Sequence, residues 1–116
     1  MATDKYLPAK DPDDVEPYHV VWCRKDGTND GSTSDTGELQ GATISTSAWT
    51  ETAGITEDSD NTIAITIAGV SYGINTVATI WLSGGTAGTD YTITNKITTS
   101  DSRTLSRSFV VPVREL

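Results

Sequence analysis

The sequence predicts an all-β fold, an antiparallel β-sandwich of about seven strands preceded by an extended N-terminal arm. Thr and Ser make up 31 of the 116 residues, and β-branched Thr is costly in helices but favourable on a pleated, half-exposed surface. Short segments with apolar residues at every second position alternate with turns rich in Gly, Asp and Ser. That spacing is typical of strands, and no capped pattern of period 3.6 accompanies it. The length predicts one domain.

Residues 1–17 are predicted to form the arm, and residues 18–116 the β-sandwich domain. Pro8, Pro12 and Pro17 alternate with acidic residues in the arm. Proline fixes its own φ angle and favours extended geometry in the residue before it, so a helix is excluded here. Two interpretations remain open, a disordered tail and an arm that lies on a neighbouring subunit.

The first strand is expected at residues 18–23, where Tyr18, Val20 and Trp22 share one face. A polar loop at residues 24–41 follows, and its length favours a functional or mobile segment. A second strand is expected at residues 42–49. Because Trp49 does not share the face of Ile44, we expect a β-bulge or a twist near Ser47.

The middle of the chain is expected to begin with a turn at residues 52–55 and an acidic loop at residues 57–60. Residues 61–67 carry Ile63, Ile65 and Ile67 at period two, the pattern of a half-buried strand. Residues 70–74 are expected to form a short edge strand or a reversal. Residues 77–82 are apolar throughout and predict a central strand buried on both faces.

A glycine-rich connection at residues 84–90 leads into a strand expected at residues 91–99, with Tyr91, Ile93 and Ile97 facing the core. A turn then precedes the last strand, expected at residues 103–114. Tyr91 follows a Gly-Thr corner, as in the tyrosine corner of immunoglobulin-like domains. The predicted sandwich is therefore of the immunoglobulin-like type.

Residues suited to catalysis are sparse. The single His19 lies within a predicted strand, and the single Cys23 follows Trp22 in an apolar run, where a cysteine is most often a small buried side chain. Gly84 and Gly85 precede a strand rather than a helix, so they form no phosphate-binding loop. The carboxylates Glu57, Asp58 and Asp60 have the pattern of ordinary loop charges, and the sequence predicts no catalytic, cofactor-binding or metal-binding residue.

One segment has a weak resemblance to a calcium loop. Residues 26–31 place carboxylates and a hydroxyl at alternate positions before a glycine. The closing acidic ligand of an EF-hand would fall on Gly37, one residue before Glu38, and flanking helices are not expected. The interpretation we favour is a solvated loop of Asx turns.

Charge is distributed unevenly along the chain. Residues 1–60 contain thirteen carboxylates and four Lys or Arg, whereas residues 61–116 contain three carboxylates and four Lys or Arg. The net charge of the chain is −8. Such an acidic chain would repel a phosphate backbone, so no nucleic-acid partner is expected. Since no signal peptide or apolar span is evident, we expect synthesis in the cytoplasm and no membrane partner.

Several segments resemble small structural proteins of tailed bacteriophages. The most specific runs from Trp81 to Phe109 and includes residues 79–95, 97–104 and 107–109. Residues 44–50 and 53–55 and Trp22 add to the resemblance. The chain departs from it in the polar segment 24–41 and in the Ile-rich stretch 63–74. On these residues the chain is similar to immunoglobulin-like virion proteins of the fibre–tail adaptor and neck protein family.

The resemblance implies a non-enzymatic virion protein of the neck or tail, which links the tail to tail fibres by protein contacts. The implied partners are other virion proteins, namely the tail, adaptor or nozzle ring, the portal region and the tail fibre, with the chain itself in a homo-oligomeric ring. Two alternatives remain open. One is a capsid decoration protein, and the other is a carbohydrate-binding module that uses Trp22, Trp49 or Trp81 as stacking rings, with Trp49 the best exposed candidate.

Overall fold

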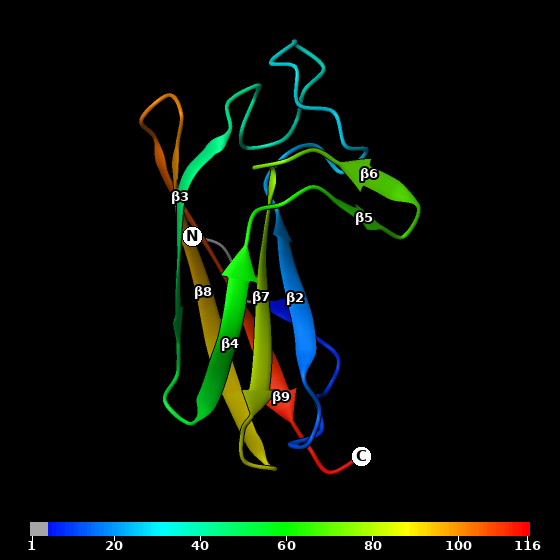
Figure 1. The fold of residues 1–116 in the computed structure, drawn as a ribbon, viewed down its shortest axis with the longest axis vertical. Coiled ribbons are helices and arrows are strands. Elements are labelled where there is room, and N and C mark those ends of the chain that lie inside the picture. The colour runs from blue at the N-terminus through cyan, green and yellow to red at the C-terminus, as the bar shows by residue number, and fades with distance from the viewer. Residues whose placement is uncertain (1–4) are drawn as a thin grey trace.

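The computed structural model describes residues 5–116, which form two packed sheets and a small hairpin (Figure 1). One sheet has the order β1-β9-β8-β3, the other has the order β2-β7-β4, and β5 pairs with β6. The strand bounds are β1 Lys5–Tyr6, β2 Glu16–Val21, β3 Ile44–Glu51, β4 Ile55–Asn61, β5 Ile65–Ile67, β6 Val70–Tyr72, β7 Val77–Gly84, β8 Thr89–Thr99 and β9 Thr104–Val113. In this part of the chain no helix is long and apolar enough to cross a membrane.

The strand order is that of an immunoglobulin-like sandwich. Strands β9, β8 and β3 occupy the positions of G, F and C, and strands β2, β7 and β4 occupy those of B, E and D. β1 runs parallel to β9 and covers part of its outer edge. The predicted all-β sandwich is confirmed. The described residues form more strands than the predicted seven, because β1, β5 and β6 are additional short strands.

The inner faces of the two sheets form the core, which has two clusters. Both sheets contribute apolar side chains at alternate positions, as the period-two pattern predicts. One cluster, around Trp22, contains Trp22, Cys23, Leu39, Ile44, Tyr72, Val77, Ala78 and Ile97. The other contains Ile55, Ile80, Leu82, Tyr91, Ile93, Phe109, Val111 and Val113.

A tyrosine corner fixes the crossover from β7 to β8. Tyr91 is buried at the start of β8, and its hydroxyl oxygen accepts a hydrogen bond from the backbone N–H of Thr86 at 2.8 Å. This is the link between phenol and upstream backbone that defines the motif. The expectation for Tyr91 is therefore confirmed.

Replacement of Tyr91 by Phe is expected to lower the free energy of unfolding by about 1 kcal/mol, because the Thr86 N–H loses its acceptor. The matched control is Tyr18→Phe, since the half-buried Tyr18 packs its ring against Phe109 without a hydrogen bond from its hydroxyl to the described residues. Urea unfolding of both variants checks this. Equal midpoints for the two variants would contradict a structural role for the corner.

The strand predicted at residues 61–67 is wrong in position. The acidic residues 57–60, expected as a loop, belong to β4, and Ile63 lies after that strand with 58% of its surface exposed. β4 is an edge strand, so its charges reach water without leaving the sheet. The short segment at residues 70–74 is confirmed in part by β6. Ile65 and Ile67 instead belong to the hairpin β5–β6, which packs against the cluster around Trp22.

Two further expectations need correction. Trp81 of β7 is 37% exposed, so this central strand is not buried on both faces. Trp81 faces outward, beside Pro17 of β2 and Ser59 of β4. The bulge in β3 exists but falls between Ile44 and Thr46 rather than near Ser47.

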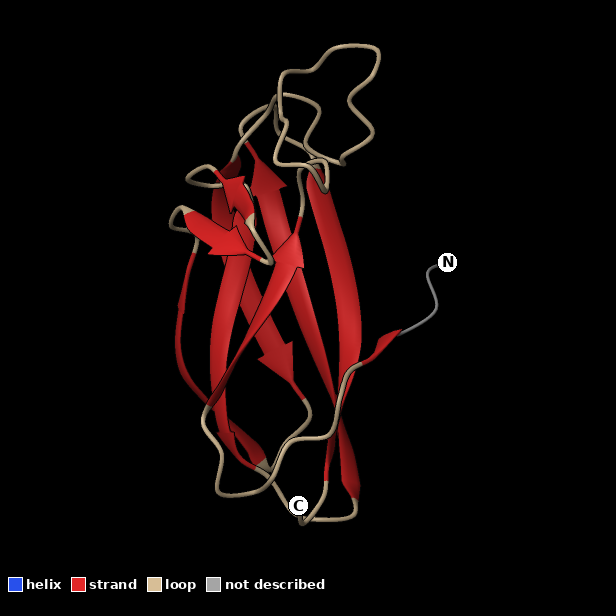
Figure 2. Ribbon diagram, turned by 90° about the vertical axis from the view of Figure 1, so that its right-hand side faces the viewer, coloured by secondary structure: helices blue, strands red, loops and turns tan. Residues whose placement is uncertain are grey.

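The described part of the predicted arm packs on its own domain, while residues 1–4 lie outside the described residues. Lys5–Tyr6 pair with β9, and the backbone of Lys10 bonds to Pro112 and Arg114. The Lys10 side chain is buried, and its Nζ donates to the carbonyls of Gly84 and Asp11, each at 2.9 Å. Figure 2 shows this segment running along the side of the sandwich. The division at residues 17 and 18 stays a prediction.

Candidate docking surface

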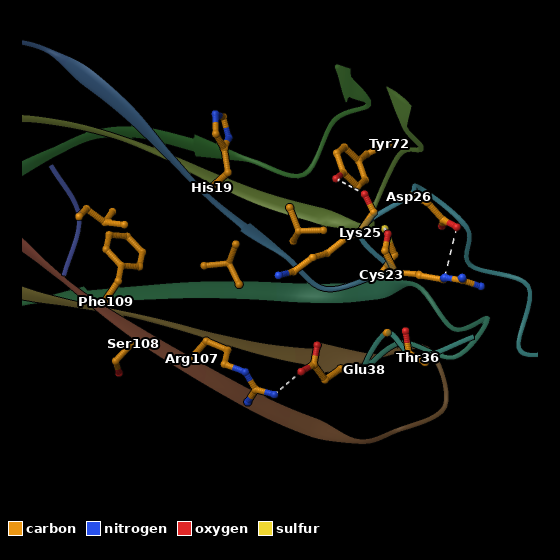
Figure 3. Close-up of a pocket in the computed structure, with 15 residues that line it drawn as sticks. His19, Cys23, Lys25, Asp26, Thr36, Glu38, Tyr72, Arg107, Ser108 and Phe109 are labelled. Atoms are coloured by element: carbon orange, nitrogen blue, oxygen red, sulfur yellow. Dashed lines mark hydrogen bonds and ion pairs between the residues drawn. The ribbon is translucent and has the colours of Figure 1, made fainter. Parts of the chain in front are cut away.

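A groove of about 800 Å³ lies on the side of the sandwich where β2 and β9 face each other (Figure 3). Val20 and Val21 of β2 form one wall, and Ser108 and Phe109 of β9 form the other. Leu7 of the N-terminal segment lines it as well. The remaining lining residues come from β2, from the loop after β2, from β6 and from β9: His19, Cys23, Arg24, Lys25, Asp26, Thr36, Gly37, Glu38, Tyr72 and Arg107. We call this hollow the β2–β9 groove.

Part of the long loop closes the upper end of the groove. The residues between β2 and β3 form no strand, as predicted for residues 24–41, but residues 35–39 are anchored. The Leu39 N–H donates to the Trp22 carbonyl, and Leu39 is fully buried. The buried Asp35 carboxylate accepts from the N–H groups of Gly31 and Gly37. Asp35 thereby holds the loop in its compact form.

Two arginines, one directly before β9 and one within it, connect this loop to the opposite sheet. Arg103 donates to the carbonyls of Glu38 and Leu39, each at 2.8 Å. Arg107 forms an ion pair with Glu38 and stacks over the Trp22 ring at 5.3 Å from the ring centroid. The loop, β2 and β9 therefore form one continuous wall at this end of the groove.

A buried polar pair lies beneath that wall. Trp22 Nε1 donates to Asn95 Oδ1 at 2.9 Å, and neither residue is accessible to solvent. Asn95 Nδ2 donates to Ser47 Oγ and to the carbonyl of Ala48. Since every polar atom of the pair has a partner, the indole is held in one orientation.

His19 and Cys23 both line the groove, and each makes a hydrogen bond within the domain. His19 Nδ1 forms a hydrogen bond with Thr79 Oγ1 at 2.9 Å, and burial lowers the pKa of the imidazole. Burial raises the pKa of the Cys23 thiol, which bonds to the Arg24 carbonyl. A raised pKa leaves less thiolate, so Cys23 is a poor nucleophile.

The carboxylates of residues 26–31 are used as acceptors within the loop. Asp26 accepts from the N–H of Thr28, and Asp30 accepts from that of Ser32, each at 2.9 Å. These backbone hydrogen bonds hold the pKa of both carboxyls below the usual value. The Asn29 amide bridges the backbone of Gly41 and Ala42. The geometry is that of Asx turns, the interpretation favoured from the sequence.

The three tryptophans do not form a stacking platform. Trp22 is fully buried, as expected. Trp49, expected to be the exposed one, is half-buried and packs edge-on against Phe109 with 6.2 Å between ring centroids. The bulge at the start of β3 turns Trp49 inward, because it shifts the alternation of the following residues by one. Trp81 is the exposed member, and it stands alone on the outer face of the sheet β2-β7-β4.

Three carboxylates lie near the opposite side of the sandwich, along β3 and β4. A register shift between Glu57 and Ser59 places Glu57 and Asp60 beside the inward-facing Leu82 and Ile80. A hydrogen bond shared with Asp60, together with burial and the nearby charges of Asp60 and Glu51, raises the pKa of Glu57 to about 7. A carboxyl with a raised pKa contributes stability at low pH that is lost as the pH rises through about 7.

Glu57→Gln is therefore expected to stabilise the chain at pH 8 by about 1 kcal/mol, since the partly exposed cluster is screened by solvent. The gain should shrink towards pH 5, where the carboxyl of the folded wild type is already protonated. The pKa of His19 is lowered rather than raised, so His19 affects the pH dependence of stability in the opposite direction. Because His19 is present in both proteins, its contribution cancels in the comparison. Urea midpoints of the two proteins at pH 5 and pH 8 measure this, and parallel pH profiles would refute it.

Comparison with known protein families identifies a match over most of the chain. The family model described as "Podophage GP4 fiber-tail adaptor protein gp77" matches residues 10–112. The matched range includes the loop 24–41 and the hairpin β5–β6, the two segments expected to depart from the resemblance. No curated protein and no solved structure matches the chain.

Proposed function

The chain belongs to the podophage fiber-tail adaptor family, and from this premise we propose that it links the tail fibre to the tail near the neck of the virion. The family match over residues 10–112 carries the proposal. An adaptor needs a rigid frame with exposed edges and loops for protein contacts. The sandwich has both, with β1 and β3 at the edges of one sheet and β2 and β4 at the edges of the other.

We further propose that the chain acts without catalysis and as a repeated subunit of a ring. Support for the first point comes from the adaptor role of the family and from the settings of His19 and Cys23. Support for the second comes from the symmetry of tails, since a small subunit that decorates a tail follows its rotational symmetry. The chain would be made in the host cytoplasm and retained in the virion.

Gold-labelled antibodies against the chain, combined with its copy number in purified virions, test this location. We expect label at the neck or tail and a copy number that matches one ring. Label spread over the head with hundreds of copies would instead identify a capsid decoration protein. Absence of label from virions would contradict the proposal that the chain is a virion component.

A further inference from the structure

We propose that the outer edge of β2 and the adjoining β2–β9 groove bind an extended, carboxylate-bearing segment of another virion protein, which adds a strand to the sheet β2-β7-β4. This inference rests on the proposed function, because it names the surface with which the adaptor holds a partner. Strand addition provides main-chain hydrogen bonds for affinity, and side-chain pockets for specificity.

The first observation is an unpaired strand edge. Among the described residues β2 pairs only with β7. The N–H of Trp22 donates to the carbonyl of Thr76 opposite β2, so the N–H groups of His19 and Val21 point away from β7. Neither amide has a hydrogen-bond partner within residues 5–116. An incoming strand would find two donors there, together with the carbonyls of the same residues.

The second observation is an asymmetry between the two sheets on this side. The outer edge of β9 is covered where β1 pairs with Phe109 and Val110 and where the Leu7 N–H donates to Val110. No described segment covers β2 in the same way. One strand position of the sandwich is therefore empty, and the groove lies beside it.

The third observation is the lining of the groove. Val20, Val21, Leu7, Phe109 and Tyr72 provide apolar surface along its length. A strand exposes alternate side chains to opposite sides, so a bound segment would place every second side chain against this surface. The burial of those side chains would add to the affinity given by the main-chain hydrogen bonds and would fix the register of the bound strand.

The fourth observation is a free cation. Figure 3 shows the Lys25 side chain reaching from the loop into the groove. Asp26 pairs with Arg24 and Glu38 pairs with Arg107, and no carboxylate within residues 5–116 pairs with Lys25. An ammonium beside apolar surface favours a carboxylate on the incoming segment and disfavours a basic one.

Another edge strand is poorly suited to the same role. β4 carries Glu57, Asp58 and Asp60, and charges on an edge strand deter pairing with a further strand. β2 has Glu16 and Pro17 at its start but no charge from Tyr18 to Val21 apart from the imidazole of His19. Pairing is therefore expected over residues 18–21, with Pro17 as its lower limit, because proline lacks the N–H that a ladder needs, and with the end of β2 at Val21 as its upper limit.

A first pair of variants tests the edge. Val21→Pro removes the outward N–H without removing a bond to β7, whereas Val21→Thr keeps that N–H with a side chain of similar shape. Each is expressed from a plasmid during infection by source phage that lacks the gene. Quantitative mass spectrometry then counts this chain and the fibre protein in purified virions. We expect a loss of about tenfold or more in one of the two counts for Val21→Pro, and near wild-type counts for Val21→Thr.

A second pair tests the charge and does not depend on the backbone of β2. Lys25 is exposed, so Lys25→Glu should fold normally, as checked by thermal unfolding of the purified chain. We expect Lys25→Glu to lose chain or fibre from the virion by about tenfold, and Lys25→Arg to retain both. Wild-type counts for both Val21→Pro and Lys25→Glu would overturn the strand-addition site. Absence of the wild-type chain from virions would instead contradict the proposed function.

Discussion

Trp22→Ala is expected to destabilise the chain by about 3–5 kcal/mol, enough to unfold much of it at 37 °C. Trp22 is the largest fully buried side chain, and it contacts both sheets and the long loop. Its removal leaves a cavity, deprives Asn95 Oδ1 of its donor and removes the ring beneath Arg107. Thermal unfolding followed by circular dichroism should show a midpoint lower by more than about 10 °C.

Trp81→Ala is the matched control, since it removes the same side chain from an exposed outward position. We expect it to cost about 1 kcal/mol. If the two variants unfolded at the same temperature, the assignment of inner and outer faces to β2 and β7 would be wrong. The comparison thus separates the effect of the buried position of Trp22 from the effect of removing any tryptophan side chain.

Gly37→Ala is expected to lower the free energy of unfolding by about 1–3 kcal/mol and to detach residues 35–39 from the domain. A Cβ at Gly37 would lie 2.4 Å from the Arg24 nitrogen and 2.5 Å from the Cys23 carbonyl carbon. These are backbone atoms directly after β2, so relief requires movement of the loop or of the strand end. Such movement would break the hydrogen bond from Leu39 to Trp22 and open the upper wall of the groove.

Gly73→Ala provides the control for that substitution. A Cβ at Gly73 has no atom within 4 Å, and its φ is not in the left-handed region. We expect a free energy of unfolding within about 0.5 kcal/mol of wild type. Hydrogen exchange of the amides in residues 35–42 should rise in Gly37→Ala alone. Unchanged exchange there would show that the loop is held by other contacts.

The strands with regular alternation were the most predictable from sequence. Tyr91, Ile93 and Ile97 alternate with polar residues along β8, and all three are buried. The pattern is reliable there because β8 has one face in the core and one face turned away from it. The corner at Tyr91 was predictable for a related reason, since its chemistry is local to residues 86–91.

Other elements were not predictable because their environment is set by distant residues. The isoleucines around Ile63 have the pattern of a core strand, yet the acidic strand β4 pairs at the edge of the sheet in their place. An apolar run such as residues 77–82 does not reveal that the face of Trp81 lacks a covering layer. The groove depends on contacts of Arg103 and Arg107 with the loop across 64 to 69 residues of chain. No local pattern indicates that pairing.

The fibre content of virions made without this chain is the most direct test of its adaptor role. Source phage that lacks the gene is grown on its host, and fibre and tail proteins are quantified in particles with filled heads. We expect tail proteins to remain at wild-type levels while the fibre protein is lost, and plasmid-borne wild-type chain to restore it. Particles that keep a full complement of fibres without the chain would contradict the account.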